Sequence, residues 1–526
     1  MVPQCVGGGG LTVASPGSIW RRALIFCHRW LGIVGSLLLL TWFVSGIVLV
    51  YAGMPALDPA DRLARLSPLD LSTATVGVGE VAVTVGFTPR RILVGMLGER
   101  PVYRLAGSGG WTTVFADTGE QLDGLSREGA LGVARQFAPE HADTATYDRR
   151  MVEPDQWTLQ SLAFFPLHRI TLNDPAGTVL YVSEPTAEPV MRTTSAARRW
   201  AYAGAVLHWL YFTPLRANVG LWSNVVIWLS IFGCLLCLSG VVIGLLTLGT
   251  RGHRFASPYS GLMRWHHYAG LVFGLVTFTW TFSGALSMEP WSWHPGTEPR
   301  RSQAEVVAGG LPRLGVLTPP HLRAGLEVLA DGFRAREIDV LHFLGVPYGL
   351  ALDPTPLGEM SGLPNTLAPL GQHGPRQRLV ALDGRAPAAF ERFEADAFSA
   401  LPEAVMPGVR VLDQTWLRTY DNYYYDRGGR RRLPVLRVRY DDPQQTWLYF
   451  DPYRGSIVRK EERSTRINRW LYHGLHSLDF PFLYGHRPLW DIVVVVLSLG
   501  GIAVSVTPIR QGWRRVLRHA VRLVGR

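Results

Sequence analysis

Four long apolar runs constrain this chain more than any other feature of its sequence. They cover residues 24–51, 219–248, 267–288 and 489–506. Each approaches or exceeds the ~20 apolar residues that an α-helix needs to cross the hydrocarbon core of a bilayer. The runs therefore predict a polytopic membrane protein with four transmembrane helices. The first run is long and ends in the bulky Val50 and Tyr51, so we expect it to stay as an anchor rather than to be cleaved as a signal peptide.

Arginines next to the runs predict how the helices are oriented. They are Arg21, Arg22, Arg251, Arg254, Arg264, Arg510, Arg514, Arg515 and Arg518. Segments of this kind stay in the cytoplasm, whereas long loops cross the membrane largely regardless of charge. The expected segments are a cytoplasmic tail 1–23, helix 24–51, an outside domain 52–218, helix 219–248, a cytoplasmic loop 249–264, helix 265–288, a second outside domain 289–488, helix 489–508 and a basic cytoplasmic tail 509–526. The net charge of +11 suits a surface of anionic lipid, and no soluble basic motif indicates nucleic-acid binding.

An internal duplication relates the two halves of the chain. The series His28, Gly32, Thr41, Trp42, Ser45, Gly46 recurs without a gap as His266, Gly270, Thr279, Trp280, Ser283, Gly284. A second series around His208 recurs around His476 at a constant offset of 268 (476 − 208). Each half therefore contains two equivalent histidines. The conserved Trp, Ser and small residues of the first series are interpreted as helix-packing positions.

The outside domains are predicted to be mixed α+β. Residues 436–440 and 446–450 alternate between apolar and polar and are separated by the turn Asp441-Asp442-Pro443, which is typical of a β-hairpin. The same pattern lies 268 residues earlier. Residues 128–137 and 390–401 show helical periodicity. The turn Ser183-Glu184-Pro185 replaces Asp451-Pro452-Tyr453, so we expect the hairpin of the first domain to be degenerate.

A loop rich in tyrosine and arginine is a candidate binding element. Asp155-Gln156 aligns with Asp413-Gln414 at an offset of only 258, which predicts an insert of about ten residues in the second domain. The segment 420–432 is the candidate insert, and its residues Tyr423, Tyr424, Tyr425, Arg427, Arg430 and Arg431 could stack on and neutralise an anionic ligand. The alternative is a loop whose rings pack on their own sheet.

The positions of the four repeated histidines indicate haem. With the orientation above, His28 and His266 lie at the cytoplasmic face, and His208 and His476 lie at the outer face. From His28 to Tyr51 a helix rises about 35 Å, so we expect one histidine pair near each boundary of the membrane. Histidines from neighbouring helices are the usual axial ligands of b-type haem. Gly32 and Gly270 follow their histidines by one helical turn and would leave room for a flat macrocycle.

Alternatives to this interpretation remain at the sequence level. Histidines at a membrane boundary also bond carbonyls or lipid head groups, and His267 or His473 could replace His266 or His476 as ligands. Zinc is less favoured because no acidic or cysteine partners accompany these positions. Cys234 and Cys237 lie in the middle of an apolar run and are expected to be packing residues, and no Cys-x-x-Cys-His motif indicates covalently attached haem.

These motifs resemble the PepSY-associated transmembrane family of bacterial inner-membrane proteins. The segments that carry the resemblance are HRWLG (28–32), RWHHYAG (264–270), VRYDD (438–442), DPYRG (451–455) and LYHGLHSLDF (471–480). The resemblance covers nearly the whole chain. It implies four membrane helices with cytoplasmic termini, two periplasmic PepSY-like domains and, as in the ferric-siderophore reductases of the family, two b-type haems. The family's haem histidines correspond to His28, His208, His266 and His476.

The leading hypothesis is transmembrane electron transfer to a periplasmic acceptor. A ferric siderophore is the favoured acceptor, and a complex of copper or another metal is the alternative. No Gly-x-Gly-x-x-Gly motif follows a strand, so the electron donor, a quinol or a cytoplasmic reductase, must be external. The rival hypothesis is a non-enzymatic membrane accessory protein whose PepSY-like domains bind a peptide or a protease by strand addition.

Overall fold

Four helices of the chain are long and apolar enough to span a membrane. The computed structural model describes residues 16–251, 254–329, 332–356, 375–385, 388–426 and 431–524. The spanning helices are α1 (Pro16–Tyr51), α8 (Val219–Thr247), α9 (Gly261–Leu286) and α16 (Leu489–Val506). The four predicted runs are therefore confirmed as helices, although α1 begins at Pro16 rather than at residue 24.

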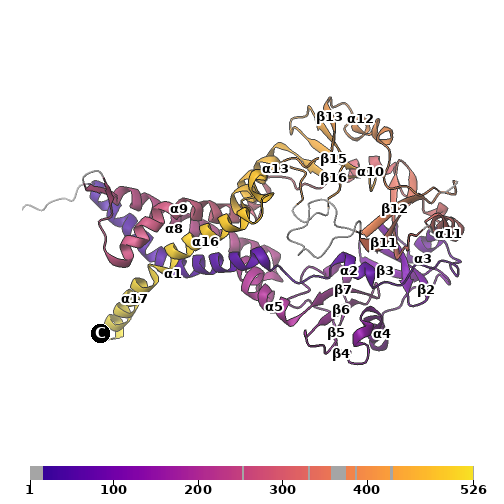
Figure 1. Ribbon diagram of the computed structural model, residues 1–526, viewed down its shortest axis with the longest axis horizontal. Coiled ribbons are helices and arrows are strands. Elements are labelled where there is room, and N and C mark those ends of the chain that lie inside the picture. The colour runs from indigo at the N-terminus through magenta and orange to yellow at the C-terminus, as the bar shows by residue number, and fades with distance from the viewer. Residues whose placement is uncertain are drawn as a thin grey trace, which may run out of the picture.

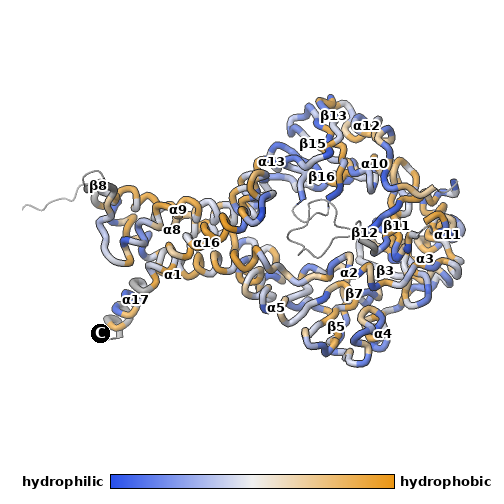
Figure 2. Tube along the Cα trace, in the orientation of Figure 1, coloured by the Kyte–Doolittle hydropathy of each residue, from blue (hydrophilic) through white to orange (hydrophobic). Residues whose placement is uncertain are grey.

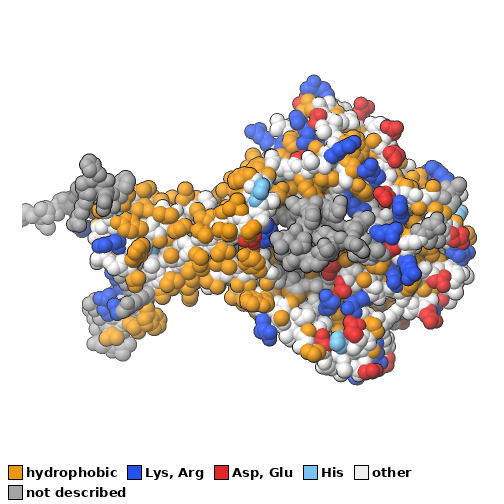
Figure 3. Space-filling view, viewed as in Figure 1, with side chains coloured by type: hydrophobic (Ala, Val, Ile, Leu, Met, Phe, Trp, Pro, Cys, Tyr) orange, Lys and Arg blue, Asp and Glu red, His pale blue; other side chains and the backbone are white. Residues whose placement is uncertain are grey.

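The four helices form one bundle. Both α1 and α9 pack against α8 and α16, so α1 and α9 face each other across the bundle axis (Figure 1). Glycines allow close approach: Gly501 contacts the ring of Phe43, and Gly500 contacts that of Phe273. The outer surface of the bundle is apolar (Figure 3), with exposed side chains that include Val34, Leu37, Leu235, Val272, Leu275 and Val496. Such a surface is stable next to lipid chains and not in water.

Beyond the bundle, each half of the chain builds a four-stranded antiparallel sheet. The first sheet has the order β4 (Thr146–Met151), β5 (Leu167–Thr171), β6 (Val179–Ser183), β7 (Glu188–Thr193). The second has the order β13 (Val411–Leu417), β14 (Val435–Tyr440), β15 (Trp447–Asp451), β16 (Ser456–Glu461). Strands β14 to β16 begin 268 residues after β5 to β7. The offset found in the sequence therefore describes a duplicated sheet.

The hairpin of the first half is complete, so the expectation that it is degenerate is wrong. Strand β6 pairs with β7 from Val179↔Thr193 to Ser183↔Glu188. Ala187 takes a positive φ of 49° at the turn position where Gly455 has a φ of 58°. Each of these residues donates its backbone N–H over 2.9 Å to the last residue of the preceding strand. The backbone of the turn is thus the same, with an alanine in a conformation that glycine adopts more easily.

The predicted ten-residue insert is also wrong. Tyr181 donates a hydrogen bond to Asp155 over 2.8 Å, and its repeat equivalent Tyr449 donates to Asp421 over 3.0 Å. Asp155 therefore corresponds to Asp421 and not to Asp413, which lies within β13. Segment 418–434 is only two residues longer than segment 152–166. The shared Asp-Gln dipeptide is a chance match.

A six-stranded antiparallel sheet joins the two halves at the end of the molecule farthest from the bundle (Figure 1). Its order is β12 (Pro375–Ala381), β11 (Val346–Pro356), β10 (Glu337–Phe343), β1 (Arg91–Leu97), β2 (Arg100–Gly107), β3 (Gly110–Phe115). The halves meet where β1 pairs with β10, at Leu93↔Asp339 and Val94↔Ile338. The two outside segments expected from the sequence are therefore not separate domains, because they share a sheet and its core.

Short helices cover the sheets and lead back to the bundle. They are α2 (Pro59–Ala64), α3 (Val78–Val85), α4 (Arg127–Phe137), α5 (Ser195–Ala201), α6 (Leu207–Trp209), α7 (Thr213–Arg216), α10 (Arg301–Ala308), α11 (Pro319–Val328), α12 (Leu401–Val405), α13 (Arg463–Asn468), α14 (Leu475–Ser477) and α15 (Pro481–Tyr484). The helix predicted at 128–137 is confirmed as α4. The one predicted at 390–401 is wrong, because there only a 3₁₀ turn (Ala395–Phe398) precedes α12.

Candidate cofactor site

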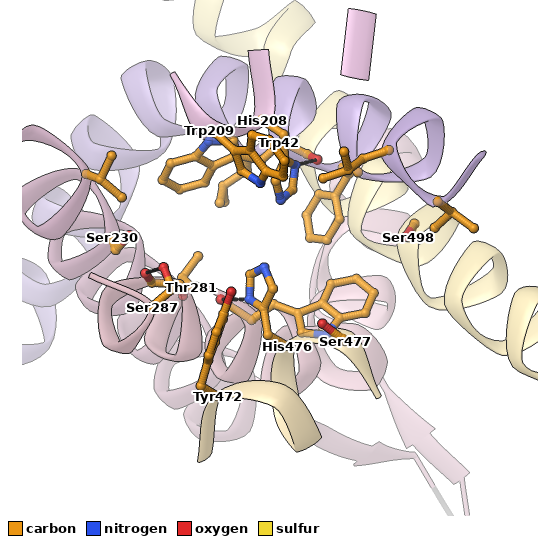
Figure 4. Close-up of a pocket in the computed structure, with 18 of the residues that line it drawn as sticks. Trp42, His208, Trp209, Ser230, Thr281, Ser287, Tyr472, His476, Ser477 and Ser498 are labelled. Atoms are coloured by element: carbon orange, nitrogen blue, oxygen red, sulfur yellow. Dashed lines mark hydrogen bonds between the residues drawn. The ribbon is translucent and has the colours of Figure 1, made fainter. Parts of the chain in front are cut away.

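His208 and His476 face each other where the bundle meets the sheets (Figure 4). His208 lies on α6 and His476 on α14, and the ring centres are 6.1 Å apart. Each short helix follows a π-helical turn, Tyr202–Val206 or Arg469–Gly474, and each is ended by a leucine with positive φ. π-Helical turns and positive φ values are uncommon in proteins as a whole. Where they occur, they are often part of a functional site. It aims both imidazoles toward the bundle axis.

The Nδ1 atoms of this outer pair are held by α1 and α9. His208 Nδ1 lies 3.1 Å from the carbonyl oxygen of Trp42 and 3.3 Å from the hydroxyl of Ser45. His476 Nδ1 lies 3.2 Å from the carbonyl of Trp280 and 3.0 Å from the hydroxyl of Ser283. A carbonyl oxygen only accepts, so each Nδ1 is protonated and donates. The lone pair of each ring is therefore on Nε2.

His28 and His266 form an inner pair with the same pattern of bonds. Their ring centres are 6.4 Å apart. His28 Nδ1 lies 3.2 Å from the carbonyl of Leu236 and 3.1 Å from the hydroxyl of Ser239 on α8. The partners of His266 Nδ1 are the repeat equivalents of these, the carbonyl of Val504 and the hydroxyl of Thr507, both at 3.1 Å. All four histidines are thus fixed in one tautomer by a carbonyl and a hydroxyl.

The spacing within both pairs suits one metal ion between two imidazoles. An imidazole nitrogen binds a transition metal at about 2.0 Å and lies roughly 1.1 Å from its ring centre, so two opposed rings have centres about 6.2 Å apart. The observed 6.1 and 6.4 Å bracket this value. Among the described residues no group of three His, Cys, Asp or Glu side chains converges. The arrangement therefore suits a metal whose remaining ligands come from a macrocycle.

A cavity of about 530 Å³ surrounds the outer pair. Its size is within the ~300–1,000 Å³ range of cofactor and ligand sites. The walls are mainly apolar and aromatic, and they include Leu39, Trp42, Phe43, Val226, Trp280, Tyr472, Trp490 and Val494. The indole nitrogens of Trp42 and Trp280 are buried and have no hydrogen-bond partner among the described residues. Two donors of this kind suit a ligand that has hydrogen-bond acceptors.

Repeated glycines leave room for the outer imidazoles. A Cβ atom on Gly46 would lie 3.3 Å from His208 Cε1, and one on Gly284 would lie 3.7 Å from His476 Cε1. Gly270, one turn after His266, has no atom within 4 Å of an added Cβ, whereas Gly32 would meet Leu236 Cδ1 at 3.8 Å. The open space expected beside the inner histidines is thus present at Gly270, while at Gly32 a leucine occupies part of it.

The two histidine pairs lie at two levels of the bundle, separated by less than the length of α1. His208 contacts Trp42 and Ser45, which lie about 14 to 17 residues after His28 on α1, so the levels are about 21–26 Å apart at 1.5 Å per residue. This is less than the ~35 Å rise from His28 to Tyr51, and the placement of one pair near each membrane boundary stays a prediction. The segment that carries His208 enters the bundle instead of stopping at its edge.

The alternative ligands differ from the paired histidines. Both nitrogens of the buried His267 are engaged within the chain, Nδ1 with Ser257 at 2.8 Å and Nε2 with the carbonyl of Gly244 at 2.9 Å. His473 is exposed and packs on Tyr472, with ring centres 4.5 Å apart. Neither ring faces a second histidine across the bundle axis. The geometry thus favours His266 and His476, the residues in repeat register.

The tyrosine-rich loop packs on its own sheet. Tyr424 is buried, stacks on Tyr449 with ring centres 5.4 Å apart and donates to the carbonyl of Arg432. Tyr423 packs edge-on against Trp447, and Tyr425 donates to Asp479 over 2.6 Å. The buried ring of Tyr424 is therefore not available for a ligand, and those of Tyr423 and Tyr425 are half-buried against neighbouring side chains, which favours the alternative that the loop packs on the protein itself. Arg431 lies over the ring of Tyr424, while Arg427 and Arg430 fall outside the described residues.

Several residues at the site were misjudged or missed from the sequence. Ser45 and Ser283 were interpreted as packing residues, although their hydroxyls hold the outer histidines. Ser239 and Thr507 are 268 residues apart, so extending the repeat along α8 and α16 identifies them as equivalent positions. Cys237 is buried and Cys234 donates to Thr281 over 3.5 Å, in agreement with packing roles.

Comparison with protein-family models and with curated proteins finds no match for this chain. The fold and the histidine pairs therefore carry the functional argument.

Proposed function

We propose that this protein is a di-haem electron carrier that crosses the bacterial inner membrane and reduces a ferric siderophore in the periplasm. One observation supports it above all others. Two pairs of imidazoles lie at two depths of a membrane-type bundle, with ring centres 6.1 and 6.4 Å apart and every Nδ1 bonded to a carbonyl and a hydroxyl. A pair of incidental capping histidines would have no reason to adopt this spacing twice.

Each set of residues has a defined task in this proposal. His28 and His266 would hold one haem b and His208 and His476 the other, and bound haem would supply one-electron redox chemistry. The hydroxyls and carbonyls at Nδ1 keep Nε2 unprotonated and make the imidazoles stronger ligands. The apolar walls formed by Leu39, Phe43 and Val494 keep water away from the outer pair.

The acceptor and the donor lie on opposite sides of the membrane in this proposal. Fe(III) that gains one electron becomes Fe(II), which hard oxygen chelators bind less tightly, so the iron is released. The outer pair lies at the junction with the sheets, on the side of the bundle from which a periplasmic acceptor would approach. Arginines flank the other end, and in this proposal the inner pair lies on the cytoplasmic side, where a quinol or a reductase would deliver electrons.

The test is an absorption spectrum of the purified protein from haem-replete cells. We expect a reduced-minus-oxidised spectrum of low-spin haem with two haems per chain. His208→Ala should remove the outer haem and leave the inner one, and His28→Ala should do the opposite.

His267→Ala is the matched control, because His267 neighbours a proposed ligand and bonds only within the chain. It should retain both haems. A pure, folded and colourless wild-type protein would overturn the proposal and favour the accessory-protein hypothesis. If the haem-loaded protein reduces copper complexes and not ferric chelates, the proposed haem sites stand and the proposed acceptor is wrong.

A further inference from the structure

The end of the bundle remote from the sheets is strongly and uniformly basic. The described residues at this end, 16–30, 248–251, 254–265 and 507–524, contain eleven arginines and no lysine, aspartate or glutamate. The formal charge of the whole chain is only +11, so this end accounts for all of it. Figure 3 shows arginine side chains at this end, next to the apolar surface of the bundle. A charge excess of this size calls for anions from outside the chain.

Helix α17 (Ile509–Val524) extends from this end at an angle to the bundle (Figure 1). Its sequence, IRQGWRRVLRHAVRLV, places Trp513, Leu517 and Val521 four residues apart, which puts them on one helical face. Their side chains are 63%, 46% and 71% exposed. Arg514 and Arg518 are exposed as well. Figure 2 shows apolar and polar residues alternating along the helix, as expected for an amphipathic one. No described part of the chain covers its apolar face.

A pair of arginines marks where this helix meets the bundle. Gly512 packs next to Ile33 on α1, so the start of α17 lies close to the inner histidines. There the pKa of Arg515 is lowered by burial and then by the charges of Arg29 and Arg518. Arg29 Nε is buried without a hydrogen-bond partner among the described residues. Two neighbouring guanidinium groups of which neither has a described carboxylate partner form a site for an anion.

We propose that α17 lies along the membrane surface at the arginine-rich end and, together with Arg29, binds the phosphate head groups of anionic phospholipids. The chemistry of both faces selects this partner. Burying a Trp-Leu-Val stripe requires an apolar phase, and the arginines require phosphate at the same depth. The boundary between head groups and acyl chains supplies both. An acidic protein would satisfy the arginines and leave the stripe exposed.

The test measures the depth of α17 in lipid nanodiscs that contain the full chain. A spin label is attached at Val521→Cys, with Arg518→Cys as the control on the arginine face, after replacement of the native cysteines by alanine. With phosphatidylglycerol mixed into phosphatidylcholine, the label at 521 should be shielded from a water-soluble relaxation agent. In pure phosphatidylcholine it should be accessible. The label at 518 should be accessible in both.

Loss of charge should weaken this lipid dependence. The triple change Arg514→Gln, Arg515→Gln, Arg518→Gln should weaken the preference for the anionic lipid about 100-fold. Arg301→Gln, at an exposed arginine on α10, should have no effect. For the unaltered helix, raising the salt concentration should weaken the preference without any change of sequence. Equal shielding at 521 in both lipids, or accessibility in both, would overturn the proposal whatever the haem content.

Discussion

The hydroxyl of Ser283 offers a sharp test of how the outer histidines are held. It lies 3.0 Å from His476 Nδ1 and donates its own proton to the carbonyl of Trp280 over 3.1 Å, so its oxygen accepts from the imidazole. Ser283→Ala removes this acceptor. The Nδ1 proton keeps a second acceptor, the carbonyl of Trp280 at 3.2 Å, and is not left unpaired. The free-energy cost of Ser283→Ala is therefore that of one lost hydrogen bond, without the larger penalty of a buried donor that has no acceptor.

A single hydrogen bond of this kind contributes about 1 kcal/mol, so we expect the outer haem to bind roughly fivefold more weakly. Ser45→Ala should have a similar effect through His208, and the double variant should lose roughly 25-fold if the two sites are independent. The assay is transfer of haem from the protein to an excess of a soluble haem-binding protein, followed at the Soret band. The inner haem serves as an internal reference.

Thr279→Ala is the matched control for Ser283→Ala. Thr279 lies on the same helix one turn earlier, and its hydroxyl bonds only the carbonyl of Val276 at 2.9 Å. The control should leave haem transfer unchanged. Equal rates of haem transfer for the two variants would refute the idea that the Ser283 hydroxyl supports the ligand. The change in rate would then come from helix propensity or from the loss of any hydroxyl on this helix.

Three further predictions address the ligand choice, the pH range and the join between the halves. His266→Ala should abolish the inner haem signal and His267→Ala should preserve it; the opposite result in the spectra would reassign the ligand. His208 lies between helices of the bundle, with Nδ1 bonded to the carbonyl of Trp42 and the hydroxyl of Ser45, so protons compete with a metal for Nε2 only in acid. Outer haem should therefore be retained from pH 8 to 5, whereas loss near pH 6.5 in a Soret titration would indicate an exposed imidazole. Glu337→Ala should destabilise the protein by about 3 kcal/mol, because it removes the buried carboxylate that binds Arg62 at 2.9 Å, while Glu305→Ala at an exposed pair should cost less than about 1 kcal/mol in thermal unfolding.

The core at the join between the halves explains why the outside region folds as one unit. Arg62 on α2 binds Glu188 on β7 at 2.8 Å and Glu337 on β10 at 2.9 Å, and Arg104 on β2 binds Glu188 at 3.0 Å. The four side chains come from both halves of the chain, one from helix α2 and three from two sheets. Breaking one member leaves an uncompensated charge in a buried place, which is why the predicted cost exceeds that of a surface pair.

Hydropathy and repeat register together determined a large part of this structure. The four spanning helices follow from local composition, since a run of about 20 apolar residues has few alternatives to a membrane helix. The pairing of His28 with His266 and of His208 with His476 follows from the duplication, because equivalent positions of a repeat occupy equivalent places. Strands β14 and β15 were predicted from alternation and turn residues alone.

What only the tertiary structure decided are contacts between residues far apart in the chain. The six-stranded sheet depends on the pairing of β1 with β10, in which Leu93 lies opposite Asp339. The local sequence of a strand does not determine which distant strand it pairs with. His28 finds Ser239, and His208 finds Ser45, through helix packing across the bundle. The depth of the outer pair and the burial of Tyr424 likewise depend on how segments pack. A sequence records each residue's own chemistry and its period along the chain, whereas its hydrogen-bond partners exist only once distant segments have come together.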